Sequence, residues 1–150
     1  MLAVALILAG CGGGGSDNWQ QVRGNGFRYN APANWIVDGS AASAGAVDRV
    51  EVRVFRLVRP YDPARRAATT RELDRVAAGI AAQLKGSVSS RRSLQVGGLD
   101  ARSYVLAFDG KAEVLTFVLQ DRLEYQLLCR RTQGGEDAPC AELLRSFETQ

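Results

Sequence analysis

The chain has 150 residues, of which 46% are hydrophobic and 23% charged, and it contains no histidine. This balance is typical of one ordinary globular domain, and a chain of this length can bury its own core. Without histidine, Ser-His-Asp and Cys-His catalytic sets, histidine-containing zinc sites and the usual proton shuttle near neutral pH are excluded. The net charge of +3 is small and the basic residues are scattered, so we expect no nucleic-acid partner.

The start of the chain predicts a signal peptide. Residues 1–10 form an apolar run that ends directly before Cys11 and is too short to span a bilayer. Residues 8–11 read Leu-Ala-Gly-Cys, which resembles the lipobox of bacterial lipoproteins; the resemblance implies lipid transfer to the Cys11 thiol and cleavage before it. The basic start usual in signal peptides is missing, since the first basic residue is Arg23. The alternative is a buried strand or helix with Cys11 as a core thiol.

The segment after Cys11 predicts a tether. Residues 12–15 are glycines, followed by Ser16 and Asp17, and such a run loses too much backbone entropy to hold a fixed structure. A phosphate-binding loop would need a preceding strand and a following helix, which are absent here. We therefore expect residues 11–18 to hold the protein, through lipid on Cys11, at the extracytoplasmic face of the cell membrane. Residues 19–150 are then expected to form a single domain.

Strands are predicted in the first half of this domain. Residues 26–32 alternate apolar with polar and residues 35–37 are apolar, which indicates two short strands or one bent strand. Residues 38–47 are mostly Gly, Ala and Ser and are expected to be a loop. Residues 49–59 predict a strand with one wet face. Its other face would carry Val50, Val52, Val54 and Val58.

A helix and a meander follow. Thr69 and Glu72 have the spacing of a capping box, and apolar residues then repeat at helical spacing up to Leu84. Lys85 and Gly86 predict a basic last turn and a left-handed stop. Four strands are expected next, joined by Gly-Gly, Asp-Gly and Asp-Arg turns, which favour an antiparallel meander. They cover residues 87–96, 99–108, 112–120 and 123–131.

The last element is a helix that starts at Asp137, with Pro139 in its first turn. The order of elements predicts an α+β fold. Together with four short motifs, this order looks like the Mog1/PsbP-like domains carried by many bacterial lipoproteins. The motifs are Phe27-Arg28-Tyr29-x-x-Pro32-x-x-Trp35, Val96-Gly97-Gly98-x-x-Ala101, Tyr125-x-x-x-Cys129 and Cys140-x-x-Leu143-Leu144-x-Ser146-Phe147. The resemblance implies an α/β/α sandwich around a mainly antiparallel sheet and, because better-known members bind proteins, a protein partner in the cell envelope.

The two remaining cysteines predict a disulfide. Cys129 shares the apolar face of its strand with Tyr125 and Leu127, so it points inward. Cys140 lies on the apolar face of the last helix, which packs against the sheet. An exported domain matures in an oxidising compartment, so we expect a Cys129–Cys140 bridge. The alternative is a pair of reduced core thiols.

No motif predicts catalysis. Most acidic residues have plain local roles, with Glu51, Glu113 and Glu124 expected on wet strand faces, and no nucleophile elbow is present. We therefore expect no enzyme, no cofactor and no metal site, and interpret the protein as an interaction or accessory domain. The alternatives are a small-ligand or lipid carrier and, less favoured, a hydrolase that uses only carboxylates. Candidate partner-binding residues are Trp19, Arg59 and Tyr61, since aromatic residues and arginine are enriched at interfaces.

Overall fold

The computed structural model describes residues 18–150. The expectations for the signal peptide, Cys11 and most of the tether therefore lie outside the described residues. The elements are β1 (Trp19–Gly24), β2 (Phe27–Pro32), β3 (Ile36–Asp38), β4 (Ala41–Ala44), β5 (Asp48–Arg56), a 3-10 turn (Pro63–Arg65), α1 (Arg66–Gln83), β6 (Ser87–Val96), β7 (Leu99–Phe108), β8 (Lys111–Gln120), β9 (Leu123–Thr132), α2 (Ala138–Ser146) and β10 (Glu148–Thr149).

The large sheet has seven strands in the order β3-β4-β5-β9-β8-β7-β6, and every pairing is antiparallel. The predicted meander forms β6 to β9. Its turns have the left-handed backbone that these residue types favour, with φ of 57° and 77° at Gly97 and Gly98 and of 46° and 67° at Asp109 and Gly110. The meander prediction is confirmed.

The first 30 residues of the described chain differ from the prediction in two places. Residues 19–24 form β1, which pairs with one edge of β2. β10 pairs with the other edge of β2, and the three strands form a small separate sheet. The expected loop at residues 38–47 is wrong, because it contains β4, where Ala41 and Ala42 are buried. Pairing with β5 orders this stretch of small residues, a tertiary contact that local composition does not carry.

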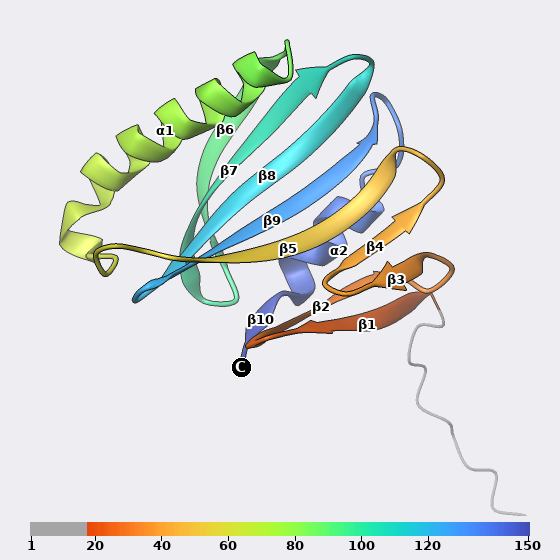
Figure 1. Cartoon of the computed structure of the whole chain (residues 1–150), viewed down its shortest axis with the longest axis horizontal. Coiled ribbons are helices and arrows are strands. Elements are labelled where there is room, and N and C mark those ends of the chain that lie inside the picture. The colour runs from red at the N-terminus through yellow and green to blue at the C-terminus, as the bar shows by residue number, and fades with distance from the viewer. Residues whose placement is uncertain (1–17) are drawn as a thin grey trace, which may run out of the picture.

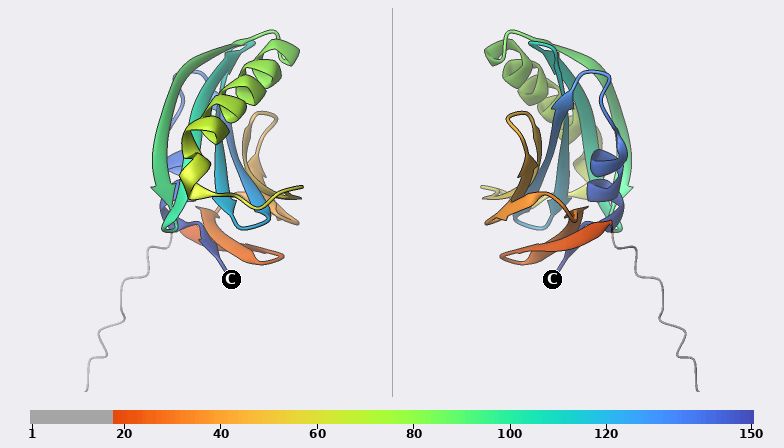
Figure 2. Two further views of the ribbon diagram at one scale, coloured as in Figure 1. Left: turned by 90° about the vertical axis from the view of Figure 1, so that its left-hand side faces the viewer. Right: turned by 90° about the vertical axis from the view of Figure 1, so that its right-hand side faces the viewer.

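The two helices lie on opposite faces of the large sheet. Figure 2 shows α1 on one side and α2, with the small sheet, on the other. Each side has a core of its own. One is centred on Phe27, Tyr125 and Phe147 beside α2, and the other on Tyr104, Leu106 and Phe117 beneath α1. The α+β fold, with layers on both faces of an antiparallel sheet, is confirmed.

The ends of α1 differ from the sequence prediction. The capping box is wrong: the helix begins at Arg66, and Asp62 instead accepts a hydrogen bond from the Ala64 N–H of the preceding turn at 2.9 Å. Lys85, rather than Gly86, takes the left-handed conformation, with φ of 56°. Gly86 has a different role, since a Cβ there would stand 2.2 Å from the Ala107 carbonyl oxygen.

The strand predicted at residues 49–59 ends earlier, at Arg56. Its buried face is confirmed at Val50 and Val52, which are fully buried, but is wrong at Val54 and Val58, which are 38% and 93% exposed. β9 begins at Leu123, the register partner of Arg56, so no β9 residue is left to pair with β5 beyond Arg56.

The predicted disulfide is present. Cys129 of β9 and Cys140 of α2 are bridged, with their Cα atoms 5.4 Å apart. It fastens α2 to the face of the sheet opposite α1.

Candidate binding surfaces

The face of the sheet that carries α1 is only partly covered. In Figure 1 the helix lies along β6 and β7, while β9 and β5 have no helix over them on this side. We call this uncovered region the open face. The strand period of two places a row of charged side chains there, namely Arg49, Glu51 and Arg53 from β5, Arg130 from β9 and Glu113 from β8.

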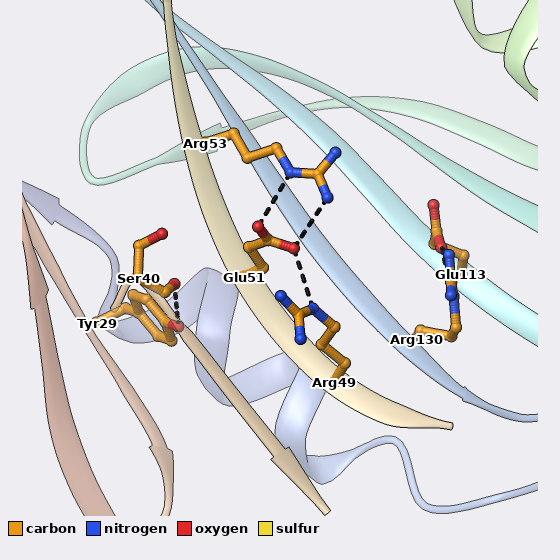
Figure 3. A network of polar contacts seen from close by, with 7 residues as sticks. All are labelled: Tyr29, Ser40, Arg49, Glu51, Arg53, Glu113 and Arg130. Atoms are coloured by element: carbon orange, nitrogen blue, oxygen red, sulfur yellow. Dashed lines mark hydrogen bonds and ion pairs between the residues drawn. The ribbon is translucent and has the colours of Figure 1, made fainter. Parts of the chain in front are cut away.

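The charges of the open face form two groups (Figure 3). Glu51 accepts hydrogen bonds from Arg49 Nε at 3.1 Å and from Arg53 Nε at 3.0 Å. Burial alone would raise the pKa of Glu51, but these two arginines outweigh burial and lower it. Glu51 in turn raises the pKa of Arg53. The group is therefore fully ionised near neutral pH.

The second group pairs Glu113 with Arg130, whose Nε donates to Glu113 Oε2 at 2.8 Å. The expected wet position of Glu113 is wrong, since only 3% of the residue is exposed. Arg130 covers it, and the guanidinium also lies 5.4 Å from the centre of the Phe108 ring. Arg49 and Arg130 are direct register partners, so the two glutamates offset the repulsion between them.

A further pair of polar groups borders the open face. The Tyr29 hydroxyl donates to the Ser40 carbonyl oxygen at 2.8 Å, as Figure 3 shows. Burial raises the pKa of Tyr29, and the nearby Glu51 carboxylate raises it further. Tyr29 is therefore a neutral hydrogen-bond donor here.

Two grooves, each of about 270 Å³, separate α1 from β6 and β7. A polar bridge lies between them: Asp74 of α1 accepts from Tyr104 at 2.6 Å and from Arg102 at 3.1 Å. Burial opposes ionisation of Asp74, but these hydrogen bonds outweigh it and lower the pKa of Asp74. The same contacts connect α1 to β7 at the middle of the helix.

The first groove lies at the start of α1 and contains the predicted residue Tyr61. Its hydroxyl donates to Asp100 Oδ2 at 2.8 Å, and Arg66 donates to both Asp100 oxygens at 2.7 Å. The hydrogen bond from Tyr61 lowers the pKa of Asp100 most, and Arg66 adds to it against the effect of burial. Asp100 is thus a paired, ionised carboxylate rather than a free acid.

The three predicted partner-binding residues do not form one site. Tyr61 packs against the core under α1, and Arg59 is exposed two residues earlier. Trp19 is half-buried in a different sheet, opposite Pro32. Their role in binding stays a prediction.

Sequence reasoning missed the ion pairs of Asp74, Asp100 and Glu113. The partners of Asp74 and Asp100 lie about 30 residues away in the chain, so no local spacing indicates them. For Glu113 a signal was present, because the two-residue turn between β8 and β9 places Arg130 opposite it. A signal was also present for the Arg49-Glu51-Arg53 group, because alternate residues of one predicted strand share a face.

The described part of the chain shows no group of three Cys, Asp or Glu side chains arranged to hold a metal ion. No helix within residues 18–150 combines the length and the apolar character needed to cross a membrane.

Comparisons with known proteins show the fold. No family model and no curated protein matches the chain. The solution structure of cyanobacterial PsbP (CyanoP) from Synechocystis sp. PCC 6803 is similar, with a TM-score of 0.61 and 13% identity over 95% of this chain and 99% of that one. A crystal structure from Bacteroides thetaiotaomicron VPI-5482 has a TM-score of 0.54 and 14% identity over 83% of this chain. The match covers 45% of that Bacteroides chain, so this protein spans less than half its length. The domain has a Mog1/PsbP-like fold, as the sequence motifs implied.

Proposed function

We propose that this protein is a lipid-anchored, extracytoplasmic interaction or accessory domain without catalytic activity. The observation that carries the proposal is the pairing of its partly buried carboxylates. Glu51, Asp74, Asp100, Glu113 and Glu142 are each bound by at least one arginine. A general acid must hold a proton near the working pH, and a carboxylate clamped by guanidinium groups is poorly suited to that task.

The disulfide supports the extracytoplasmic part of the proposal. Disulfides persist in oxidising compartments and are rare in the reducing cytosol. The Cys129–Cys140 bridge therefore agrees with the export that the Leu-Ala-Gly-Cys segment implies. Lipid on Cys11 would be the attachment, and two acyl signals on one cysteine would make it stable.

The two grooves bear on the carrier alternative. A lipid carrier requires a deep apolar pocket, whereas the polar bridge of Asp74, Arg102 and Tyr104 stands between these grooves. Their charged walls are already paired within the protein. This arrangement favours an interaction domain over a carrier of apolar molecules.

Membrane attachment is tested by detergent-phase partitioning of the full chain made in a bacterial host. We expect the wild-type protein in the detergent phase and the Cys11→Ala variant either in the aqueous phase or unprocessed. The matched control is Cys129→Ala/Cys140→Ala, which changes two cysteines but keeps Cys11. Correctly cleaved Cys11→Ala protein in the membrane fraction would contradict the anchor.

The interaction is tested by recovering the intact lipoprotein from its own membranes and identifying bound proteins and lipids. We expect a specific protein that is lost after competition with untagged lipoprotein. Assays with ester, glycoside, peptide and phosphoester reporters should show no turnover above background. Turnover that a single carboxylate substitution abolishes in a folded variant would favour the hydrolase alternative.

A further inference from the structure

The second half of β5 is an open edge of the large sheet. β9 pairs with β5 from Arg49 to Arg56, whereas β4 pairs only from Asp48 to Glu51. We call residues 53–58 the β5 edge. Residues 53–56 pair with β9 on one side and with no strand of the described chain on the other, and residues 57 and 58 follow the end of β5.

The backbone of the β5 edge offers hydrogen bonds to a further strand. The Val52 N–H donates to Ser40 on the β4 side at 3.2 Å, and the Leu57 N–H donates to Arg122 on the β9 side at 2.8 Å. Directions alternate along an antiparallel strand, so Val54 and Arg56 turn their N–H and C=O groups outward. Within residues 18–150 these outward groups have no hydrogen-bond partner. Such an edge is a template for another chain.

Apolar side chains are exposed along the same edge. Val54 is 38% exposed, Phe55 46% and Val58 93%. Val54 and Phe55 point to opposite faces of the sheet, so an added strand would find one apolar contact on each face. Bulges, prolines and charged side chains protect sheet edges. The β5–β9 register is regular and the first proline after it is Pro60, so the arginines are the protective feature that this edge carries.

Arginines outnumber carboxylates at this edge, where Glu124, the register partner of Phe55, accepts a hydrogen bond from Gln126. Arg56, Arg59 and Arg122 lie on or beside the edge, and no carboxylate of the described residues pairs with them. Arg122 is held in place by donating to the Val58 carbonyl oxygen at 3.2 Å. A second copy of the same edge would bring like charges together, which destabilises cross-strand pairs. Acidic side chains would complement the three arginines.

We propose that the β5 edge binds an extended acidic segment of a partner protein, which adds as a strand and completes the hydrogen bonds of Val54 and Arg56. This inference rests on the proposed interaction function and specifies its surface and the chemistry of its partner. Strand addition takes its affinity from the backbone and its specificity from alternate side chains. Insertion of this edge into a lipid bilayer is disfavoured, because unpaired backbone groups are costly in hydrocarbon.

The test uses the full chain and a short labelled peptide of alternating valine and glutamate. Fluorescence anisotropy measures binding, and amide hydrogen exchange locates it. We expect binding, with slower exchange at Val54 and Arg56. A peptide methylated on the backbone nitrogens that face the protein should bind at least about tenfold more weakly, because its strand hydrogen bonds are lost. A peptide with lysine in place of glutamate should bind more weakly by a similar factor.

Two variants probe the edge from the protein side. Val54→Pro removes an outward N–H that no internal hydrogen bond uses, and proline is accepted at edge positions of this kind. Arg56→Glu/Arg59→Glu reverses the charge without touching the backbone. Each should weaken binding about tenfold or more. The control Arg75→Glu/Arg92→Glu makes the same charge change at exposed positions of α1 and β6 and should bind as the wild type does.

Any one of three results would overturn the proposal. These results are no peptide binding at millimolar concentration, equal binding of the methylated peptide, or equal binding by the folded charge-reversal variant. Preferential binding to vesicles of phosphatidylglycerol and phosphatidylcholine would indicate a membrane surface, and self-association reduced by Val54→Pro would indicate a second copy. If the wild-type lipoprotein and both edge variants recover the same partner equally well, the proposal for the β5 edge fails and the proposed interaction function stands. If no partner is recovered, the interaction function itself fails.

Discussion

The two faces of the large sheet are held by different kinds of contact. On the α2 face, Phe147 lies 5.4 Å from Tyr125 and 6.2 Å from Phe27, measured between ring centres. The Cys129–Cys140 bridge adds a covalent link there. On the other face, Tyr104 and Phe117 of the sheet are also buried, with ring centres 5.9 Å apart, but α1 itself buries only Leu73, Ala77 and Ala81 against them. The Asp74 bridge supplies the polar attachment of α1.

This difference separates a firmly attached helix, α2, from a less firmly attached one, α1. Aromatic side chains bury large areas and dominate core energetics, whereas alanine lets a helix approach closely but removes little apolar surface from water. The α1 face also contains both grooves and the open face. We therefore expect α1 to open locally at a lower free energy than α2.

The largest effect is expected at Phe147, beside α2. Phe147 is 1% exposed, so Phe147→Ala should lower the free energy of unfolding by about 3–5 kcal/mol. Val76→Ala is the control on α1, where the side chain is 43% exposed, and it should change stability by less than about 0.5 kcal/mol. Urea unfolding measures both. Equal effects would remove the contrast between the faces.

Loss of the disulfide should come next. Cys129→Ala/Cys140→Ala removes a bridge between residues 11 positions apart, and the chain-entropy account gives about 3 kcal/mol for a loop of this order. Urea unfolding of this variant, compared with the wild type with and without reductant, measures the effect. An unfolding free energy insensitive to both changes would show that packing alone holds α2.

A smaller effect is expected at the bridge of α1. Asp74→Asn weakens charged hydrogen bonds to Tyr104 and Arg102 and should lower stability by about 1–2 kcal/mol near neutral pH. Because the pKa of Asp74 is lowered in the folded protein, its contribution is present above its unfolded pKa and is lost as the pH falls through the folded value. The difference between wild type and variant should therefore shrink below about pH 4.

Hydrogen exchange shows where the Asp74 effect falls. Amides of α1 should exchange faster in Asp74→Asn, while those of α2 follow only the global change. The control Asp109→Asn alters a carboxylate whose side chain is 84% exposed, and surface pairs of this kind contribute little. Uniform acceleration in both helices would mean that α1 does not open by itself.

The smallest effect is expected at the end of α1. Lys85 holds a left-handed conformation with φ of 56°, which glycine adopts without strain, so Lys85→Gly should stabilise the protein by about 0.5–1 kcal/mol. Lys85→Ala should not, since alanine carries the same Cβ. Thermal unfolding distinguishes the two variants. Stabilisation by both would point to lysine charge rather than backbone strain.

Much of the fold was predictable because its signals are local. The meander depends on turn residues such as Asp109 and Gly110, whose preferred backbone matches the hairpins that form. The disulfide followed from the strand period at Cys129 and the helix period at Cys140. In contrast, β4 was invisible, since Ala41 and Ala42 become strand residues only through pairing with β5.

The candidate surfaces were harder to predict than the fold. Glu113 has the sequence pattern of a wet strand position, yet Arg130 from the neighbouring strand buries it. The open β5 edge depends on where β4 stops pairing, and no residue of β5 itself encodes that point.

Periodicity, turn chemistry and cysteine placement therefore determined the order of elements from α1 to α2, the antiparallel meander and the Cys129–Cys140 bridge. Only the tertiary structure decided which half of the sheet α1 leaves uncovered, which arginines meet Asp74 and Asp100 and which edge of β5 remains unpaired. The physical reason is the separation along the chain over which each kind of interaction acts. Backbone preferences and side-chain periods act within a few residues, whereas ion pairs and strand edges depend on residues that meet only after folding.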